Sequence, residues 1–277
     1  MASKLRILQI EETKMLKELI DFFSANNIRY FALAGTFLGS VRHKGFVPWD
    51  DDIDVGVPRP DYDKLIALTK KNKKIGSMYV EYLYHDFSIL HYPLRVVNPK
   101  LIMRINKFGS TIDMPTWITL FPLDGMPNNS FKRYIHSKIL LYRRFCYVIA
   151  RYTDMVDPNH HKFKGIKKIL VKGVGELKIY KLFDKKKTAI KMDKSLKKYS
   201  YDESDYILTL MGGYKLKEMF PKKVFGKGKK YKFEDIELIG PKDYEKYLTQ
   251  IYGDWRTPPP IDHPERNHHG LIDVICN

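Results

Sequence analysis

Four aspartates stand within five positions of the stretch W-D-D-D-I-D-V-G-V, residues 49–57: Asp50, Asp51, Asp52 and Asp54. Two unit charges ~5 Å apart repel each other by about 0.8 kcal/mol in water and by ~3 kcal/mol at an effective dielectric constant of 20. The stretch also opens an apolar run that is typical of a buried strand. Carboxylates gathered at such a place are typical of a site for a hard divalent cation, which offsets their repulsion.

Asp52 and Asp54 are the two aspartates that a strand would direct to one side. Residues two apart in a strand share a face and lie ~6.6 Å apart along it, so Ile53 and Val55 take the opposite, core-facing side. Magnesium is usually held by one or two carboxylates, while substrate phosphates and waters complete its octahedron. We therefore predict that Asp52 and Asp54 bind Mg²⁺, with Mn²⁺ as the alternative, and act in catalysis.

Two simpler interpretations of the acidic cluster are a solvated turn and a calcium-binding loop. A calcium loop requires Gly and further oxygen ligands at fixed later positions, which I-D-V-G-V-P (53–58) does not supply. Asp50 and Asp51 are expected to be turn residues or to support the two metal ligands from outside the coordination sphere.

Gly39 and Ser40 precede the aspartates, with eleven residues between Ser40 and Asp52. A Gly-Ser turn at the N-terminus of a helix offers backbone N–H groups to phosphate. On its own this dipeptide is a weak signal, but here an Asp-Ile-Asp strand follows it. The combination resembles the nucleotidyltransferase superfamily, in which a Gly-Ser pair holds nucleotide phosphates and two aspartates hold the metal.

The longer segment F-A-L-A-G-T-F-L-G-S-V-R-H-K-G-F-V-P-W-D-D-D-I-D, which starts at residue 31, is similar to the LicD family. These are phosphocholine-type transferases related to fukutin and fukutin-related protein. F-P-L-D-G-M-P at 121–127, I-Y-G-D-W at 251–255 and the P-P…E-R…H-H ending also resemble that family. The resemblance covers nearly the whole chain and implies a family domain over roughly residues 25–260.

The resemblance implies transfer of a phosphoryl-alcohol group, phosphocholine or a similar one, from a CDP-activated donor to a sugar hydroxyl. The acceptor would be a cell-surface glycan or glycolipid, and CMP would be released. Phosphoryl transfer depends on positioning and charge neutralisation, which a metal on Asp52 and Asp54 would supply at the donor diphosphate. Two alternatives stay open: a true nucleotidyltransferase that uses an NTP, and an inactive basic binding module.

One position departs from the family pattern. Many members have an aspartate in the stretch I-D-I-F-P-L-D-G as the third carboxylate of the site, but this chain has Thr119 there. A threonine is neither a strong base nor a charged ligand. Asp124, Asp113 or a water is expected to take the role, and Asp124, which precedes Gly125, has an equally good interpretation as a turn residue.

A set of further residues is expected to bind the substrate. Arg42 or Lys44 is expected to contact donor phosphates, because a guanidinium or ammonium group suits phosphate oxygens; the alternative is a salt bridge to the aspartates. Arg95, with apolar neighbours in Y-P-L-R-V-V-N, needs an anionic partner, either a carboxylate or the substrate. The full set is Gly35, Thr36, Gly39, Ser40, Arg42, Lys44 and Arg95.

The elements that position these residues can be predicted from periodicity and turn residues. We predict a nucleotidyltransferase-like α+β fold, with a mixed sheet flanked by helices in a catalytic core at 1–127. A helix-rich, lysine-rich portion at 128–277 is expected to pack on that core. The individual predictions are helices at 8–26, 36–45 and 59–71, strands at 30–35 and 53–57, β-rich runs up to F-P-L-D-G and helices from 130 to about 200.

Charge indicates what the protein meets. Its formal net charge is +17, and residues 162–198 hold fourteen lysines and three acids, so anionic partners are expected. Nucleotides and an acidic membrane surface fit the predicted chemistry, whereas nucleic acid is not an expected partner. The lysine-rich segment has two interpretations, a solvated helical face and a surface for an acidic partner.

Cysteine content and hydropathy indicate the cellular compartment in which the protein is expected. With only Cys146 and Cys276, a disulfide framework is not expected. His268 and His269 are adjacent, which suits one tetrahedral ion poorly, so zinc is not expected either. The chain shows neither a secretory signal at its start nor an 18-residue apolar run. We expect a cytoplasmic protein, with peripheral contact at the inner face of a membrane as an option.

Overall fold

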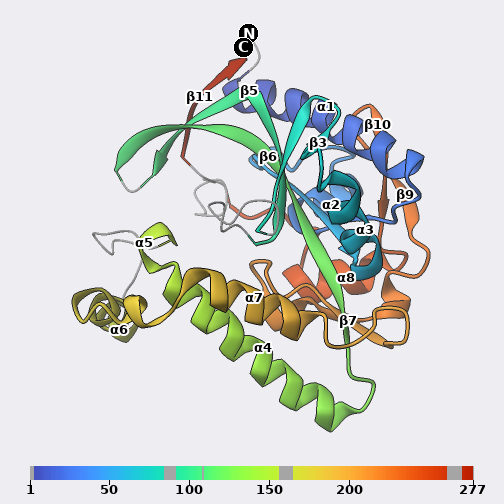
Figure 1. The fold of residues 1–277 in the computed structure, drawn as a ribbon. Helices are drawn as coiled ribbons and strands as arrows, with labels where there is room; N and C mark the ends of the chain where they lie inside the picture. Colours follow the sequence, from blue (N-terminus) through green and yellow to red (C-terminus); the bar gives the residue numbers. More distant parts are fainter. Residues whose placement is uncertain (1–2, 84–91, 108, 156–164, 261–269, 277) are drawn as a thin grey trace.

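The computed structural model describes residues 3–83, 92–107, 109–155, 165–260 and 270–276. Its centre is a mixed sheet in which six strands follow the order β1-β2-β6-β5-β4-β3 (Figure 1). Three further strands join it: β11 pairs with β5, β7 pairs with β6, and β8 pairs with β7. The strands are β1 (Phe31–Ala32), β2 (Ile53–Pro58), β3 (Lys74–Ile75), β4 (Met78–Glu81), β5 (Leu94–Lys107), β6 (Ser110–Met126), β7 (Tyr206–Leu208), β8 (Met219–Pro221), β9 (Lys229–Phe233), β10 (Ile236–Gly240) and β11 (Leu271–Cys276).

Helices surround this sheet, and β9 and β10 form a separate hairpin. α1 packs against β6 and β11, whereas α4 and α7 pack against each other below the sheet in the view of Figure 1. The α-helices are α1 (Lys4–Ala25), α2 (Ala34–Arg42), α3 (Arg59–Thr69), α4 (Ser130–Ala150), α5 (Tyr152–Met155), α6 (Gly165–Glu176), α7 (Lys185–Leu196) and α8 (Tyr244–Tyr252). Short 3-10 turns are η1 (Ile179–Leu182), η2 (Lys215–Glu218) and η3 (Lys222–Val224).

This architecture confirms the predicted α+β class with its mixed sheet. β2 runs parallel to β6, whereas β5 runs antiparallel to β6. The predicted helices at 8–26 and 59–71 and the helical region after residue 130 correspond to α1, α3 and α4. Strands β7, β8 and β11 come from beyond residue 127, so the sheet draws on both parts of the chain. Within the described residues, no helix is both long and apolar enough to cross a membrane.

Helix starts follow local capping chemistry. The side chain of Ser3 accepts a hydrogen bond from Arg6 N at the start of α1. Asn129 does the same for Lys132 N at the start of α4. A polar side chain at this position satisfies one of the N–H groups that a helix leaves without an internal partner.

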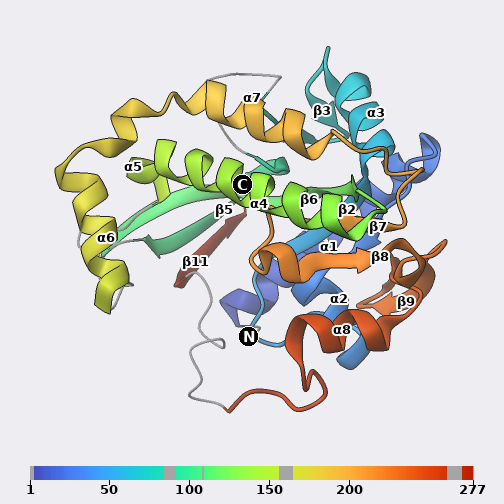
Figure 2. The ribbon, with the colours of Figure 1, turned by 90° about the horizontal axis from the view of Figure 1, so that it is seen from below.

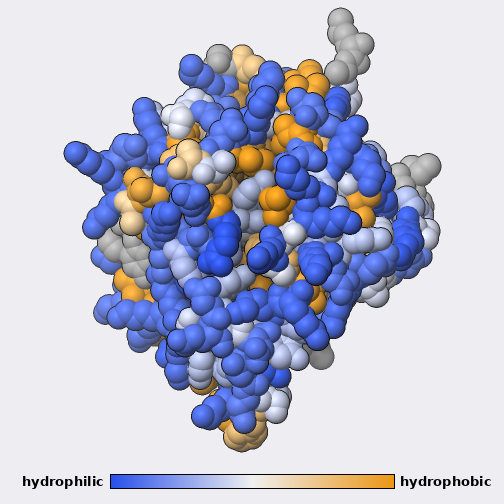
Figure 3. Space-filling model, turned by 90° about the vertical axis from the view of Figure 1, so that its right-hand side faces the viewer, coloured by the Kyte–Doolittle hydropathy of each residue, from blue (hydrophilic) through white to orange (hydrophobic). Residues whose placement is uncertain are grey.

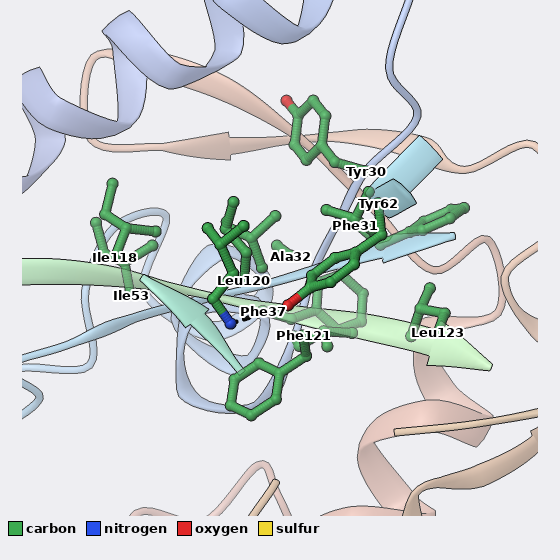
Figure 4. Packing of buried hydrophobic residues seen from close by; sticks show 14 of the residues in the cluster. Tyr30, Phe31, Ala32, Phe37, Ile53, Tyr62, Ile118, Leu120, Phe121 and Leu123 are labelled. Carbon is green, nitrogen blue, oxygen red and sulfur yellow. Dashed lines mark hydrogen bonds between the residues drawn. The ribbon is translucent and has the colours of Figure 1, made fainter. Parts of the chain in front are cut away.

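The core between β2, β6 and the helices is close-packed and apolar (Figure 4). Ile53 of β2 and Ile118 and Leu120 of β6 are each fully buried. Tyr62 of α3 is also fully buried, and its hydroxyl accepts a hydrogen bond from Leu94 N at 2.9 Å. These contacts fix β2, and with it the aspartates, against the middle of the sheet.

Two predicted boundaries are wrong. The turn residues of P-L-D-G-M-P-N-N (122–129) predict that the β-rich run ends at Phe121, yet β6 continues to Met126. Pairing with β7 from Asp124 onward keeps this segment extended, and β7 lies some 80 residues later in the chain. Pro122 falls between the last β5 pair at Leu120 and the first β7 pair, where its missing N–H removes a bond from neither. The strand expected at 30–35 contains only two residues, and α2 begins sooner.

Candidate active site

Asp54 occupies the face of β2 opposite to the core. Ile53 and Val55 are 0% and 1% exposed, whereas Asp54 is half-buried, so the predicted alternation is confirmed. Asp54 pairs in register with Thr119 of β6, and Thr119 pairs in register with Arg95 of β5. Because side chains in register point to the same side of a sheet, these three form one polar row.

The N-terminus of α2 is tied to Asp54. The N–H of Asp54 donates to Thr36 Oγ1 at 2.9 Å, and Leu33 N donates to the carbonyl of Asp54 at 3.0 Å. Ala34 has a left-handed backbone with φ +43°, a strained conformation for alanine. Its N–H is held by the hydroxyl of Tyr247 from α8, at 3.1 Å. Strain that is supported in this way is typical of a functional turn.

Two amides at this helix start stay available to a ligand. The first bond of the helix runs from Phe37 N to Leu33 O at 2.9 Å, so the N–H groups of Gly35 and Thr36 have no helical partner. No hydrogen bond of the described residues uses either group. A side chain does not fit at Gly35, because a Cβ there would lie 2.2 Å from Asp50 Oδ2. Free amides at a helix N-terminus are a ready site for phosphate.

Gly39 and Ser40 do not form the Gly-Ser turn that the sequence suggested. Both lie inside α2, where Ser40 is fully buried and its hydroxyl donates to Phe37 O at 2.8 Å. A Cβ on Gly39 would lie 2.4 Å from Gly45 O, so this glycine lets the following loop pack on the helix. The predicted position of this pair at a helix N-terminus is therefore wrong. The helix starts at Ala34, which gives the amide positions to Gly35 and Thr36.

The site contains an acidic residue, Glu218, in addition to the aspartates of the sequence motif. Burial, together with the charges of Asp52, Asp50 and Glu218, raises the pKa of the Asp54 carboxyl well above its usual range. Glu218 ends η2 and is 6% exposed; its Oε1 accepts a hydrogen bond from Tyr214 N at 3.0 Å. Burial raises the pKa of Glu218 to about 7. A carboxyl with such a pKa beside Asp54 is suited to accept a proton near neutral pH.

Glu12 of α1 lies behind the aspartates. It is 1% exposed, and both of its carboxyl oxygens are buried without a hydrogen-bond partner among the described residues. Burial and the charges of Asp52, Asp51 and Asp50 raise its pKa well above the usual range. The helical spacing could have revealed it, because Glu12 lies four residues after buried Leu8 on the apolar face of α1.

Glu218, by contrast, carries no such signal. It lies 164 residues from Asp54 and follows K-L-K, which is typical of a solvated surface turn. Thr119 indicates that β6 lacks the third carboxylate of the family pattern. It does not indicate which other residue supplies a carboxylate.

Neither acid that was expected to replace the missing one joins Asp52 and Asp54. Asp124 is 1% exposed and accepts hydrogen bonds from Arg59 Nε at 2.6 Å and Arg59 Nη2 at 2.9 Å. It lies five residues along β6 from Thr119, about 16 Å by strand geometry. Asp113 is exposed and paired with Arg104 at 2.8 Å. Asp124 is therefore held by Arg59, away from Asp52 and Asp54.

Two arginines lie near these groups: Arg95, which belongs to the polar row, and Arg144 of α4. Arg95 stacks on the ring of Trp117, with its guanidinium carbon 4.0 Å from the ring centroid, and burial lowers its pKa to about 10. Arg144 of α4 lies near Glu218, and burial lowers its pKa as well. Arg144 Nε is buried without a hydrogen-bond partner among the described residues. Arg95 also has a carboxylate neighbour, because Glu81 of β4 pairs with it in register and its charge acts on Arg95. Arg144 is suited to an anionic ligand.

Arg42 and Lys44 lie at the other end of α2 from Gly35. Arg42 Nη1 donates to Trp255 O at 2.6 Å, and its guanidinium carbon lies 5.9 Å from the Trp49 ring centroid. Lys44 is exposed, and its Nζ donates to Val41 O at 3.0 Å. The structure thus does not bring these two predicted phosphate contacts to the amides of the helix start.

The donor set fits magnesium better than a closed metal cage. No cluster of three or more His, Cys, Asp or Glu side chains that could hold a metal occurs in the part of the chain that the structure describes. Magnesium is commonly held by two carboxylates and completes its sphere with substrate oxygens and water. The excess negative charge that raises the Asp54 pKa is what such a cation would offset. His268 and His269 lie outside the described residues.

Comparison with known proteins agrees with this geometry. Residues 27–92 match the LicD/FKTN/FKRP nucleotidyltransferase domain, and this region contains the four aspartates and the start of α2. The chain is 26% identical, over an alignment of 282 positions, to the lipopolysaccharide cholinephosphotransferase LicD of Haemophilus influenzae. The alignment covers 94% of this chain and 95% of that protein. Over these ranges the chain is similar to the LicD family.

Two uncharacterized rickettsial proteins share a shorter region with this chain. Those of Rickettsia prowazekii and Rickettsia typhi are each 35% identical to it over 63 residues, which is 23% of this chain. The shared region is 24% of the first protein and 20% of the second.

Proposed function

We propose that this protein is a LicD-type phosphotransferase that moves a phosphoryl-alcohol group, phosphocholine or a similar one, from a CDP-activated donor to a sugar hydroxyl. The acceptor is a glycan or glycolipid of the cell surface, and CMP leaves. One observation carries the proposal: the 2.9 Å hydrogen bond from Asp54 N to Thr36 Oγ1. It locks a metal-binding strand to a helix start with two available amides, which is the pair of features that a nucleoside diphosphate requires.

In this proposal Asp52 and Asp54 hold Mg²⁺, with Mn²⁺ as the alternative. Bound there, the ion neutralises charge on the donor diphosphate. The amides of Gly35 and Thr36 bind and orient a phosphate of the donor. Phosphoryl transfer needs little more than such positioning and electrostatic support.

The remaining groups act on the acceptor side and on the transferred phosphate. Arg95 of the polar row and Arg144 of α4 neutralise phosphate oxygens. Glu218, whose pKa is about 7, accepts the proton of the attacking sugar hydroxyl. It takes the role for which Thr119 is chemically unsuited.

The proposal is tested by CMP release. Purified protein is incubated with Mg²⁺, a lipopolysaccharide-type acceptor and a panel of CDP-alcohols that includes CDP-choline. We expect metal-dependent CMP release that is lost on addition of a chelator and in Asp54→Asn. Asp113→Asn, an exposed aspartate that pairs with Arg104 far from the site, is the matched control and keeps its activity. Release of pyrophosphate from an NTP, or unchanged turnover in Asp54→Asn, would contradict the proposal.

A further inference from the structure

One face of α4 is covered with exposed apolar side chains. The described chain has fifteen large hydrophobic side chains that are exposed, and six of them lie on this one helix. Their spacing of three and four residues places them on one face of the helix. They are Phe131, Tyr134, Ile135, Ile139, Tyr142 and Phe145, which we call the α4 stripe.

The α4 stripe is not needed to hold the helix in place. The opposite face of α4 packs on the protein through Leu140, Tyr147 and Ala150, each no more than 1% exposed. Phe131 and Phe145 in the stripe are 70% and 59% exposed.

In the view from below, α4 crosses the near side of the molecule, beside α7 (Figure 2). On the face shown in Figure 3 most of the surface is hydrophilic, with apolar residues interspersed. Contiguous exposed apolar surface of the α4 kind marks an interaction site.

Positive charge surrounds the α4 stripe. Lys138 lies within it, and Lys132 lies at its edge. α7, which packs against α4, presents further exposed lysines, namely Lys186, Lys187, Lys191 and Lys194. η1 adds Leu182, which is largely exposed beside these lysines. An anionic surface with an apolar layer beneath it is complementary to this combination.

The same combination argues against a second protein copy on this face. The core of a protein–protein interface is depleted in lysine, and two copies would bring their lysine-rich helices together. Aromatic rings with lysines between them are instead typical of helices that lie in the interface of a bilayer. We propose that the α4 stripe docks the protein on the surface of an anionic lipid bilayer, with α4 lying in the plane of the headgroups.

This docking mode places the candidate site toward the lipid. Arg144 lies on the inner side of α4, near Glu218, while the stripe occupies the outer side. One helix diameter, about 10 Å, therefore separates the bilayer surface from the polar row of the sheet. The proposed docking depends only on the surface of α4, so it does not depend on the proposed reaction.

The test is co-sedimentation with vesicles. Full-length protein is mixed with vesicles of phosphatidylcholine alone or with 30% phosphatidylglycerol, at low and high NaCl. We expect at least tenfold tighter partitioning onto the anionic vesicles, weakened by salt. Phe131→Gln/Phe145→Gln should reduce partitioning at least tenfold. Leu68→Gln/Tyr79→Gln replaces two exposed apolar residues on α3 and β4 and should bind as wild type does. Circular dichroism confirms that each variant is folded.

Several results would overturn the inference. Wild-type protein that stays in the supernatant, or a stripe variant that binds as wild type does, would remove its basis. A wild-type dimer that becomes a monomer in Phe131→Gln/Phe145→Gln, measured by light scattering, would assign the stripe to a second copy. Asp54→Asn should bind vesicles normally, so failure of docking and failure of the proposed reaction can be told apart.

Discussion

Two buried groups of charged residues in this protein differ in how their negative charge is balanced. In the first, the Arg59 cluster, one guanidinium holds Asp124 through two hydrogen bonds and Asp193 at 3.3 Å, and Tyr92 donates to Asp193 at 3.1 Å. In the second group, the aspartate site, several acidic side chains lie close together.

The aspartate site comprises Asp52, Asp54, Glu12 and Glu218. Each of the last three has a raised pKa that burial causes, with the neighbouring acids adding to it at Asp54 and Glu12. The comparison separates structure from function. A buried acid that its own fold neutralises holds elements together, whereas buried acids left in excess are prepared for a ligand that the chain does not supply.

The largest expected effect is that of Asp54→Asn. Removing a metal ligand should lower the rate of CMP release by at least ~10³-fold, because the donor diphosphate loses its counter-charge. Stability should not fall, since the raised pKa means that ionised Asp54 costs folding free energy at neutral pH. Steady-state kinetics and urea unfolding measure the two effects. A variant that is both active and less stable would place Asp54 in the structural class of the Arg59 cluster.

Arg59→Met should show the reverse pattern. Buried Asp124 would lose its counter-ion and Asp193 would keep only Lys197, at 3.1 Å, which costs about 3–5 kcal/mol of unfolding free energy. Activity of the folded fraction, measured at low temperature, should change much less than in Asp54→Asn. Lys64→Met, at an exposed position on α3, serves as the control. Loss of turnover at full stability would mean that the Arg59 cluster belongs to the site.

Glu218→Gln sharpens the comparison through pH. A folded-state pKa of about 7 lies above the ordinary value of 4.5, so the wild type binds an extra proton when folded and loses stability as pH rises through this range. The glutamine variant should match the wild type near pH 4 and exceed it by about 3 kcal/mol above pH 7.

The same Glu218→Gln variant should lose ~10²-fold or more in turnover, because its amide cannot accept a proton. Thermal unfolding from pH 4 to 8 and CMP release at pH 7.5 give the two measurements. A variant with full activity would remove Glu218 from the mechanism.

The smallest expected effect is that of Thr36→Val. Losing Oγ1 leaves Asp54 N without its acceptor, which should cost about 1–2 kcal/mol of stability and about tenfold in turnover. Thr36→Ser keeps the acceptor and should restore most of both. If serine and valine behave alike, the hydrogen bond does not position the strand.

Local sequence was sufficient for the features that depend on local periodicity. Alternation across I-D-V fixed the side of Asp54, and the helical spacing of apolar residues located α1 and α4. These predictions succeeded because a strand or helix in contact with a core shows its buried face in its own residues.

Features that depend on distant segments were not accessible in this way. Glu218 reaches Asp54 only through the path of the chain after β7, and β7 itself keeps F-P-L-D-G-M extended. The start of α2 at Ala34, two residues before the predicted start at residue 36, is held by the hydroxyl of Tyr247 from α8. Asp124 looked like a catalytic acid because nothing near it in the sequence shows that Arg59 neutralises it.

A crystal structure with Mn²⁺ and a non-hydrolysable CDP-choline analogue tests the central claim most directly. The account predicts an anomalous peak within ~2.2 Å of carboxylate oxygens of Asp52 and Asp54. It also predicts diphosphate oxygens within hydrogen-bond distance of the amides of Gly35 and Thr36. Nucleotide bound elsewhere, with no metal at these two aspartates, would contradict it.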